Sequence, residues 1–384
     1  MSLAGSSLIS LRDLSKADIV RILDTADEMA KSVGFDDPGD RVAARPMDRI
    51  MAALFFEPST RTRLSFESAM LRLGGQVIGF ADASASSTRK GESLADTIRM
   101  AAAYCDIIVI RHPAAGAAQV AADHASVPVI NGGDGPHEHP TQTLTDLFCI
   151  RRNKGTLEGL TVGLCGDLKY GRTVHSLAPV MARFGSQIVC ISPEELKMPP
   201  EVLDEVEAIG GERPPEVATF EQAIAKLDVL YMTRVQAERF DDPAAYERVK
   251  GSHILTPEVM AQAGEQTIVL HPLPRVDEIA PAVDEDPRAR YFQQAAGGVP
   301  VRMALISHLL GAEQTPERKG SFHLGGKTPV VAEIEEEVGT PEPIAAPGSR
   351  CPNAKCITQT ESSLQMKVLD RGGQSRCYYC EQPL

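Results

Sequence analysis

Residues 50–63 read IMAALFFEPSTRTR, and this stretch decides the fold. Its first seven residues are all apolar, which is typical of a strand buried on both faces of a parallel sheet. The residues after it carry an apolar face at the i, i+3, i+4 and i+7 spacing of a helix, formed by Phe66, Ala69, Met70 and Leu73. The donor-rich segment 59–63 therefore lies between a buried strand and the N-terminus of a helix.

Similar short apolar runs recur along the chain, with helical patterns between them. They lie at residues 107–110, 127–130, 160–164, 188–191, 229–232 and 268–270. Buried strands that alternate with helices are typical of an α/β protein with parallel sheets. We predict two such domains, each with a mostly parallel sheet flanked by helices, and a small third module at the C-terminal end.

The domain boundaries follow from changes in this pattern. A helical segment ends at the sequence RRNKG, which separates a first domain, 1–150, from a second, 151–311. A nearly all-apolar segment predicts a buried helix over about 299–311, which we expect to pack back on the first domain. Residues 312–350 are rich in proline, glycine and glutamate, so they are interpreted as a linker to the module at 351–384.

The composition excludes several classes of protein. The chain has 384 residues, of which 43% are apolar and 24% charged, as in an ordinary globular protein. Its net charge of -13 argues against a nucleic-acid or membrane-surface partner. No apolar run approaches the roughly 20 residues of a membrane-spanning helix, and the N-terminus lacks a signal-peptide pattern. We therefore expect a cytoplasmic protein.

Polar and cationic side chains follow several of the predicted strands. They are found in the segments 59–63, 111–113, 132–139, 166–172, 233–236 and 271–275. Because parallel sheets bind ligands beyond the carboxyl ends of their strands, we expect these segments to face one cleft. Segment 59–63 offers an anion the free amides of a helix N-terminus, hydroxyl groups and arginine. Two alternatives stay open: a serine N-cap with solvated arginines, and a surface charge at Arg111.

Together these motifs resemble those of the catalytic chain of the aspartate carbamoyltransferase family. The matching segments are FEPSTRTR (56–63), KGESLAD (90–96), RHP (111–113), HPTQ (139–142), GDLKYGR (166–172), TRVQ (233–236) and HPLPR (271–275), in the family's order. The resemblance covers about residues 11–311 and implies the carbamoyltransferase fold. It also implies transfer of the carbamoyl group from carbamoyl phosphate to the amine of L-aspartate, which yields N-carbamoyl-L-aspartate and phosphate in de novo pyrimidine biosynthesis.

The resemblance assigns roles to individual residues. The implied carbamoyl phosphate ligands are Ser59, Thr60, Arg61, Thr62, Ser86, Lys90, Arg111, His139 and Gln142. The implied aspartate ligands are Lys90, Arg172, Arg234, Gln236 and Leu273. Catalytic roles fall on Arg61, Lys90, Arg111 and His139. In the family the loop that carries Ser86 and Lys90 enters the site of the adjacent subunit, so we expect a homo-oligomer that is at least a trimer.

The chemistry of this reaction suits these residue types. Attack of an amine on the carbamoyl carbon builds negative charge on the carbonyl oxygen and expels phosphate, which calls for cations and hydrogen-bond donors rather than a nucleophile. The departing phosphate can accept the amine proton, so no cofactor is expected for the chemical step. Ornithine carbamoyltransferase is the nearest competitor, but it carries a cysteine where this chain has Thr141 and another where it has Pro272. A scaffold protein without activity is disfavoured because no donor of the motif is missing.

The C-terminal module is marked by its cysteines. Four of the eight cysteines gather there: Cys351, Cys356, Cys377 and Cys380. Two close pairs separated by 20 residues predict a structural zinc site with four thiolate ligands, whereas disulfides are disfavoured in a cytoplasmic protein. The surrounding sequence resembles the zinc domain of the family's regulatory chain. The chain is thus interpreted as a fusion protein without the regulatory nucleotide domain, and the zinc module is expected to dock on its own or a neighbouring catalytic domain.

Overall fold

The computed structural model describes most of the chain. The described residues are 2–37, 47–85, 91–236, 240, 243–311, 342–346, 349–361, 364–371 and 373–384. Two predicted site residues, Ser86 and Lys90, lie outside these ranges, as does most of the predicted linker. None of the helices within these ranges is long and apolar enough to cross a membrane.

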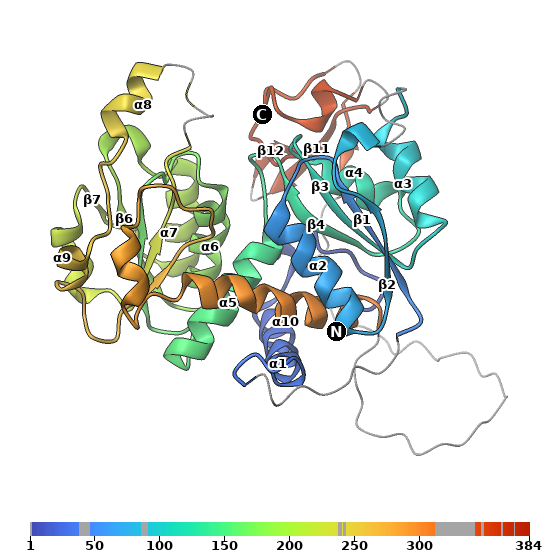
Figure 1. The fold of residues 1–384 in the computed structure, drawn as a ribbon. Helices are drawn as coiled ribbons and strands as arrows, with labels where there is room; N and C mark the ends of the chain where they lie inside the picture. Colours follow the sequence, from blue (N-terminus) through green and yellow to red (C-terminus); the bar gives the residue numbers. More distant parts are fainter. Residues whose placement is uncertain are drawn as a thin grey trace.

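The first half of the chain forms a four-stranded parallel sheet in the order β2-β1-β3-β4 (Figure 1). Its strands are β1 (Ile50–Phe55), β2 (Gln76–Phe80), β3 (Ile107–His112) and β4 (Val129–Asp134). Its helices are α1 (Lys16–Ser32), α2 (Thr60–Arg72), α3 (Leu94–Ala102), α4 (Ala117–His124) and α5 (Pro140–Lys154). Alternate residues of β1 enter two separate cores: Met51 and Phe55 meet α1, α2 and α5, whereas Ala52 and Leu54 meet α3 and α4.

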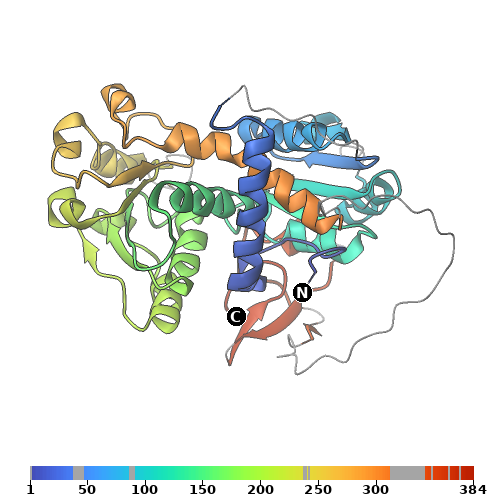
Figure 2. The ribbon, with the colours of Figure 1, turned by 90° about the horizontal axis from the view of Figure 1, so that it is seen from below.

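The second half forms a five-stranded parallel sheet in the order β7-β6-β5-β8-β9. Its strands are β5 (Thr161–Cys165), β6 (Gln187–Ile191), β7 (Glu216–Val217), β8 (Val229–Met232) and β9 (Ile268–Leu270). Its helices are α6 (Arg172–Arg183), α7 (Pro200–Gly210), α8 (Pro243–Val249) and α9 (Pro257–Met260). The last helix, α10 (Tyr291–Leu309), crosses from this half to the first and packs on α1, α2 and α5 (Figure 2).

In the two parallel-sheet halves, three elements differ from the sequence prediction. The edge strands β2 and β7 were not predicted, because their side chains are mostly exposed and form no apolar run. Helix α10 begins at Tyr291 rather than near residue 299, since Gly297, Gly298 and Pro300 hide its start in the sequence. A Cβ atom at Gly297 would lie 3.0 Å from the Phe148 ring of α5, so close helix packing requires the glycine.

The C-terminal module packs on the first half of its own chain. Its described residues form three antiparallel strands, β10 (Ile344–Ala345), β11 (Lys367–Arg371) and β12 (Gln374–Cys377). Strand β10 lies in the segment interpreted as a linker, so the module begins earlier than predicted, because Ile344 and Ala345 pair with β11. Ala115, in the loop after β3, donates its N–H to the carbonyl of Lys355 at 2.9 Å and accepts from the N–H of Ile357 at 2.8 Å. Because a Cβ atom at Gly116 would lie 2.6 Å from the Tyr379 carbonyl oxygen, the module also needs glycine at this position. Module and first half thus share one core.

Arg12 joins all three parts of the chain. Its guanidinium lies 2.7 Å from Glu138 in the first half, 2.9 Å from Glu205 in the second and 3.0 Å from Glu381 in the module. Glu138 is buried, and burial raises its pKa while Arg12 opposes the shift. The Glu138 carboxyl also accepts a hydrogen bond from Ser176 of α6 at 2.8 Å. This cluster therefore fixes the position of the segment that leads into α5.

Candidate active site

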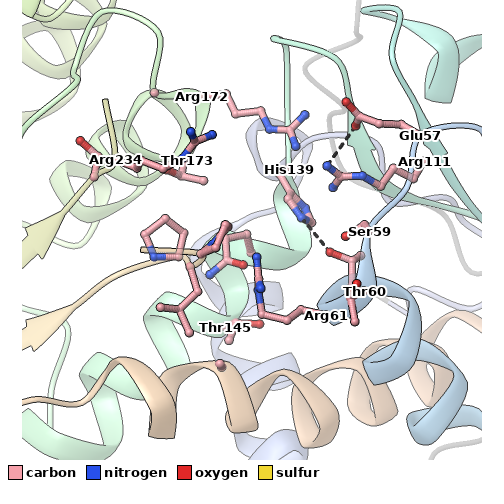
Figure 3. A pocket seen from close by; sticks show the side chains of 18 of the residues that line it. Glu57, Ser59, Thr60, Arg61, Arg111, His139, Thr145, Arg172, Thr173 and Arg234 are labelled. Atoms are coloured by element: carbon pink, nitrogen blue, oxygen red, sulfur yellow. Dashed lines mark hydrogen bonds and ion pairs between the residues drawn. The ribbon is translucent and has the colours of Figure 1, made fainter. Parts of the chain in front are cut away.

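A cavity of about 710 Å³ lies between the two halves, beyond the carboxyl ends of their central strands. All the predicted substrate ligands that the structure describes line it: Ser59, Thr60, Arg61, Thr62, Arg111, His139, Gln142, Arg172, Arg234, Gln236 and Leu273 (Figure 3). Glu57 is the one acidic side chain among the described lining residues. The cavity thus carries the net positive charge that is expected of an anion-binding site.

The N-terminus of α2 forms one wall of the cavity. Ser59 is the N-cap residue, yet among the described residues its hydroxyl makes no capping hydrogen bond. Arg61 lines the cavity, whereas Arg63 lies outside it and pairs with Glu67 one turn later at 3.1 Å. The hydroxyl groups, the free helix amides and one of the two arginines are therefore placed where an anion can bind.

The guanidinium groups of Arg111 and Arg172 both lie close to the backbone of Gly133. Arg111 forms an ion pair with Glu57 at 3.0 Å and donates to the carbonyl of Gly132 at 3.2 Å. Arg172, at the start of α6, donates to the carbonyl of Gly135. A Cβ atom at Gly133 would lie 2.8 Å from Nη1 of Arg111 and 3.2 Å from Nη2 of Arg172. Glycine at position 133 thus leaves room for both guanidinium groups beside the backbone.

We expect Gly133→Ala to lower kcat/KM by about 10-fold, because the added methyl group forces the guanidinium group of Arg111 to shift and crowds that of Arg172. Gly133 has a φ of +118°, so backbone strain adds to the effect. Gly185→Ala is the matched control, since Gly185 also has a positive φ, of +77°, but a Cβ atom there would meet nothing within 4 Å. Steady-state kinetics of both variants, with their melting temperatures, test this; unchanged kcat/KM in a folded Gly133→Ala protein contradicts it.

His139 is a neutral hydrogen-bonding group in this cavity. It is the N-cap residue of α5, and its Nε2 lies 3.5 Å from the Thr62 hydroxyl. Burial, together with the charges of Arg172, Arg111 and Arg302, holds the pKa of His139 well below its ordinary value. Its buried Nδ1 has no protein partner among the described residues. A ligand that donates a hydrogen bond to the imidazole, or accepts one from it, therefore suits this position.

The second half supplies the opposite wall. Arg234 and Gln236 follow β8, and Gln236 is held by hydrogen bonds to the carbonyl of Tyr170 at 3.0 Å and the carboxyl of Asp167 at 3.2 Å. Leu273 has a φ of +54° and donates its N–H to Nδ1 of His271 at 2.8 Å. The backbone after β9 is thus turned toward the cavity by local hydrogen bonds.

Several residues near the cavity were missed by the sequence analysis. Asp146 accepts hydrogen bonds from Gln142 at 2.7 Å, Gln294 at 2.6 Å and Tyr231 at 3.0 Å, and burial raises its pKa to about 7. Arg302 of α10 is buried, lies over the Phe66 ring at 4.9 Å and lines the cavity. Each residue left one signal in the sequence. Asp146 is a charge within the helical pattern of Leu144 and Leu147, and Arg302 directly precedes the nearly all-apolar segment of the last predicted helix.

Four thiols meet in the C-terminal module. The Sγ atoms of Cys351, Cys356, Cys377 and Cys380 are buried and lie within 4.8 Å of one another. Separations of 3.5 Å for Cys351 and Cys380 and 3.9 Å for Cys356 and Cys377 are too long for disulfides. They match the edges of about 3.8 Å of a sulfur tetrahedron around Zn²⁺ with bonds of about 2.3 Å. The four residues therefore fit a structural metal ion.

Comparison with known proteins identifies the family. The model of the aspartate/ornithine carbamoyltransferase carbamoyl-P binding domain matches residues 6–152, and that of the Asp/Orn binding domain matches residues 158–309. The catalytic subunit of aspartate carbamoyltransferase from Methanopyrus kandleri is 53% identical over 311 residues, which cover 81% of this chain and 99% of that protein. The chain belongs to the aspartate carbamoyltransferase family.

Other relatives agree with this assignment. The Thermococcus kodakarensis catalytic subunit of aspartate carbamoyltransferase is 54% identical, with the match covering 81% of this chain and 99% of that protein. The catalytic subunit of M. jannaschii aspartate transcarbamoylase has a TM-score of 0.73 at 46% identity, and the match covers 80% of this chain and 99% of that chain. The aspartate transcarbamoylase from Trypanosoma cruzi in complex with N-(phosphonacetyl)-L-aspartic acid has a TM-score of 0.75 at 41% identity, and the match covers 80% of this chain and 97% of that chain.

The C-terminal module matches a different part of the same enzyme system. Residues 349–384 match the metal binding domain of the aspartate carbamoyltransferase regulatory chain. This aspartate carbamoyltransferase family member therefore joins catalytic domains and a regulatory-type metal-binding domain in one polypeptide, as the sequence predicted.

The loop between β4 and α5 contains a buried ion pair that makes stability depend on pH. Nδ1 of His137 lies 3.0 Å from the carboxyl of Asp134. Burial disfavours the charged imidazole, but Asp134, Glu138 and Glu381 together outweigh burial and raise the pKa of His137 from 6.5 to about 9. Since the folded-state pKa is the higher one, the stabilisation is complete below pH 6.5 and is lost as the pH rises through about 9.

We therefore expect the stability advantage of the wild type over His137→Gln to shrink by about 3 kcal/mol between about pH 6 and pH 9.5. Denaturant unfolding of both proteins across this range measures it. A difference that stays constant with pH would show that His137 does not titrate in the folded protein as described.

Proposed function

We propose that this chain transfers the carbamoyl group from carbamoyl phosphate to L-aspartate. The observation that carries the proposal is one cavity between two parallel sheets that gathers Arg61, Arg111, Arg172 and Arg234 around a helix N-terminus. Two anionic substrates need such a set of cations, because each must be taken from water and held beside the other. The product chemistry places the reaction in de novo pyrimidine biosynthesis.

The first half provides the groups for carbamoyl phosphate. We assign the phosphate to Ser59, Thr60, Thr62 and Arg61 at the N-terminus of α2, with Arg111 on its other side. The neutral imidazole of His139 donates a hydrogen bond to the carbamoyl oxygen, and Gln142, held by Asp146, contacts the carbamoyl group. These donors stabilise the negative charge that develops on that oxygen.

The second half provides the groups for L-aspartate. Arg172, Arg234 and Gln236 bind the two carboxylates, while the backbone at Leu273 lies beside the amine. The amine nitrogen forms a bond to the carbamoyl carbon as the bond from that carbon to the phosphate oxygen breaks. The amine proton passes to the departing phosphate, so no protein carboxylate is needed as a base.

Aspartate rather than ornithine is favoured by two positions. Pro272 lines the cavity and offers no thiol to an amine. Thr141 is buried and its hydroxyl faces Arg302 at 3.4 Å, so it supports a cation rather than a second amino group. Arginines at positions 172 and 234 also match a dicarboxylate better than a side chain that carries an ammonium.

Three further assignments complete the proposal. We propose zinc as the ion of the four-cysteine site, because four thiolates in a tetrahedron suit it and leave no open position for chemistry. We propose a homo-oligomer of at least three chains, in which Ser86 and Lys90 complete the site of a neighbour. We place the protein in the cytoplasm, since thiol ligands need a reducing compartment.

A product assay tests the function directly. Purified protein is incubated with carbamoyl phosphate and either L-aspartate or L-ornithine, and the products are separated. Carbamoyl-aspartate alone supports the proposal, whereas citrulline would assign the ornithine reaction. No product with either amino acid would overturn the proposed activity.

A further inference from the structure

One residue of the cavity wall comes from the metal-binding module. Lys355 lines the cavity together with Pro113 and Gly135, although it belongs to the metal-binding module, where it directly precedes Cys356. Its backbone carbonyl accepts the N–H of Ala115 at 2.9 Å, four residues after Arg111. The module therefore reaches the edge of the substrate cavity through the loop that follows β3.

The position of Lys355 is fixed from both sides. Cys356, the next residue, is fully buried as one of the four metal-site cysteines and forms a parallel bridge with Ala115. On the other side, the N–H of Lys355 donates to the side chain of Asn353 at 2.9 Å. The backbone is thus held by the metal site and by the catalytic half at once, whereas the lysine side chain is exposed.

The surroundings of Lys355 indicate an anion as its partner. Gly135 also lines the cavity, and its carbonyl accepts a hydrogen bond from Arg172. A Cβ atom at Gly135 would lie 2.2 Å from the carbonyl oxygen of Pro113, so these two segments pack closely beside Lys355. Lys355 therefore lies on the same side of the cavity as Arg111 and Arg172. Within the described part of the chain its ammonium forms no ion pair, so its charge is not neutralised by a nearby carboxylate.

We propose that Lys355 is a substrate-binding residue, which supplies positive charge from the metal-binding module to the phosphate end of the cavity. The inference rests on the proposed function and names its carbamoyl phosphate, or the phosphate product, as the ligand. A flexible ammonium at the rim attracts a dianion and holds it loosely, so it acts on substrate affinity more than on the chemical step. The module then contributes to the site itself besides covering one face of the first half.

Kinetics of variants at this position test the proposal. We expect Lys355→Glu to raise the KM for carbamoyl phosphate about 5- to 20-fold and Lys355→Ala about 2- to 5-fold, with kcat within about twofold of wild type. Lys355→Arg keeps the charge and should stay close to wild type. Raising the salt concentration should reduce the difference between wild type and Lys355→Glu, because the interaction is electrostatic.

The control is Lys226→Glu, the same charge change at an exposed lysine of the second half that does not line the cavity. Bound metal and melting temperature are measured for every variant. An unchanged KM in Lys355→Glu overturns the inference. A raised KM together with lost metal or a lower melting temperature also overturns it, since the lysine would then act only by supporting the module.

Binding of inorganic phosphate separates this inference from the proposed function. Calorimetry on the full chain needs no turnover, and Lys355→Glu should weaken the affinity for phosphate by about the same factor as the KM. If the wild type forms no carbamoyl-aspartate but phosphate binding still depends on Lys355, the proposed function fails and the anion site stands. If phosphate binds both proteins equally, the inference fails even when the enzyme is active.

Discussion

Replacing Arg61 by methionine is expected to lower kcat by about 10³-fold, the largest effect of any single substitution considered for this chain. Arg61 lies in the first turn of α2 and lines the cavity, and in the proposed reaction it binds the phosphate that departs. Methionine keeps much of the side-chain length but removes all donors and the charge. The loss should appear in kcat as well as in kcat/KM, because the interaction strengthens as phosphate departs.

Arg63 offers a control within the same helix turn. It does not line the cavity and pairs with Glu67, so Arg63→Met should change kcat less than about threefold. Steady-state kinetics with both substrates and a thermal melt of each variant make the comparison. Equal losses in the two variants would mean that α2, rather than the Arg61 guanidinium, is what the reaction needs.

Loss of the bound metal is expected to unfold the C-terminal module. Cys377→Ser removes one of four thiol ligands, and structural Zn²⁺ contributes on the order of 10 kcal/mol to the folding of comparable modules. The described part of the module has three short strands and a small apolar core of its own, so this loss exceeds what its packing can offset. Zinc content, limited proteolysis and the melting temperature measure the outcome.

The same substitution should also weaken the first half of the chain. Ile357 and Tyr379 of the module share a core with α3 and α4, and unfolding would expose this apolar surface to water. Cys105→Ser is the control, because Cys105 lies outside the metal site and is only half-buried. A Cys377→Ser protein that keeps its metal, its melting temperature and its resistance to protease would contradict the structural role of the site.

Much of the parallel-sheet architecture was predictable because buried strands leave a direct trace in the sequence. The run 229–232 coincides with β8 and the run 268–270 with β9, since every residue of both strands is buried, although β9 lies at the edge of its sheet. Exposed edge strands such as β2 leave no such trace. Helix α10 was predicted too short, because packing on α5 outweighs the low helix propensity of Gly297 and Gly298.

The residues of the candidate active site also fall into a group that the sequence predicts and a group that it does not. Motifs such as STRTR and HPTQ are contiguous, so the sequence alone identified Arg61, Arg111 and His139 as candidates, and the structure places all three in one cavity. Asp146 and Arg302 belong to no motif, and their importance arises from contacts between residues that are distant in the chain.

The sequence by itself determined the two parallel sheets, the family motifs and the set of four cysteines, because each depends on local periodicity or spacing. Only the tertiary structure decided where the metal-binding module packs, that Lys355 reaches the cavity, and that His139 is held neutral. The reason is physical: burial, electrostatic shifts and contacts between modules are set by distances in space, which the order of residues along the chain does not contain.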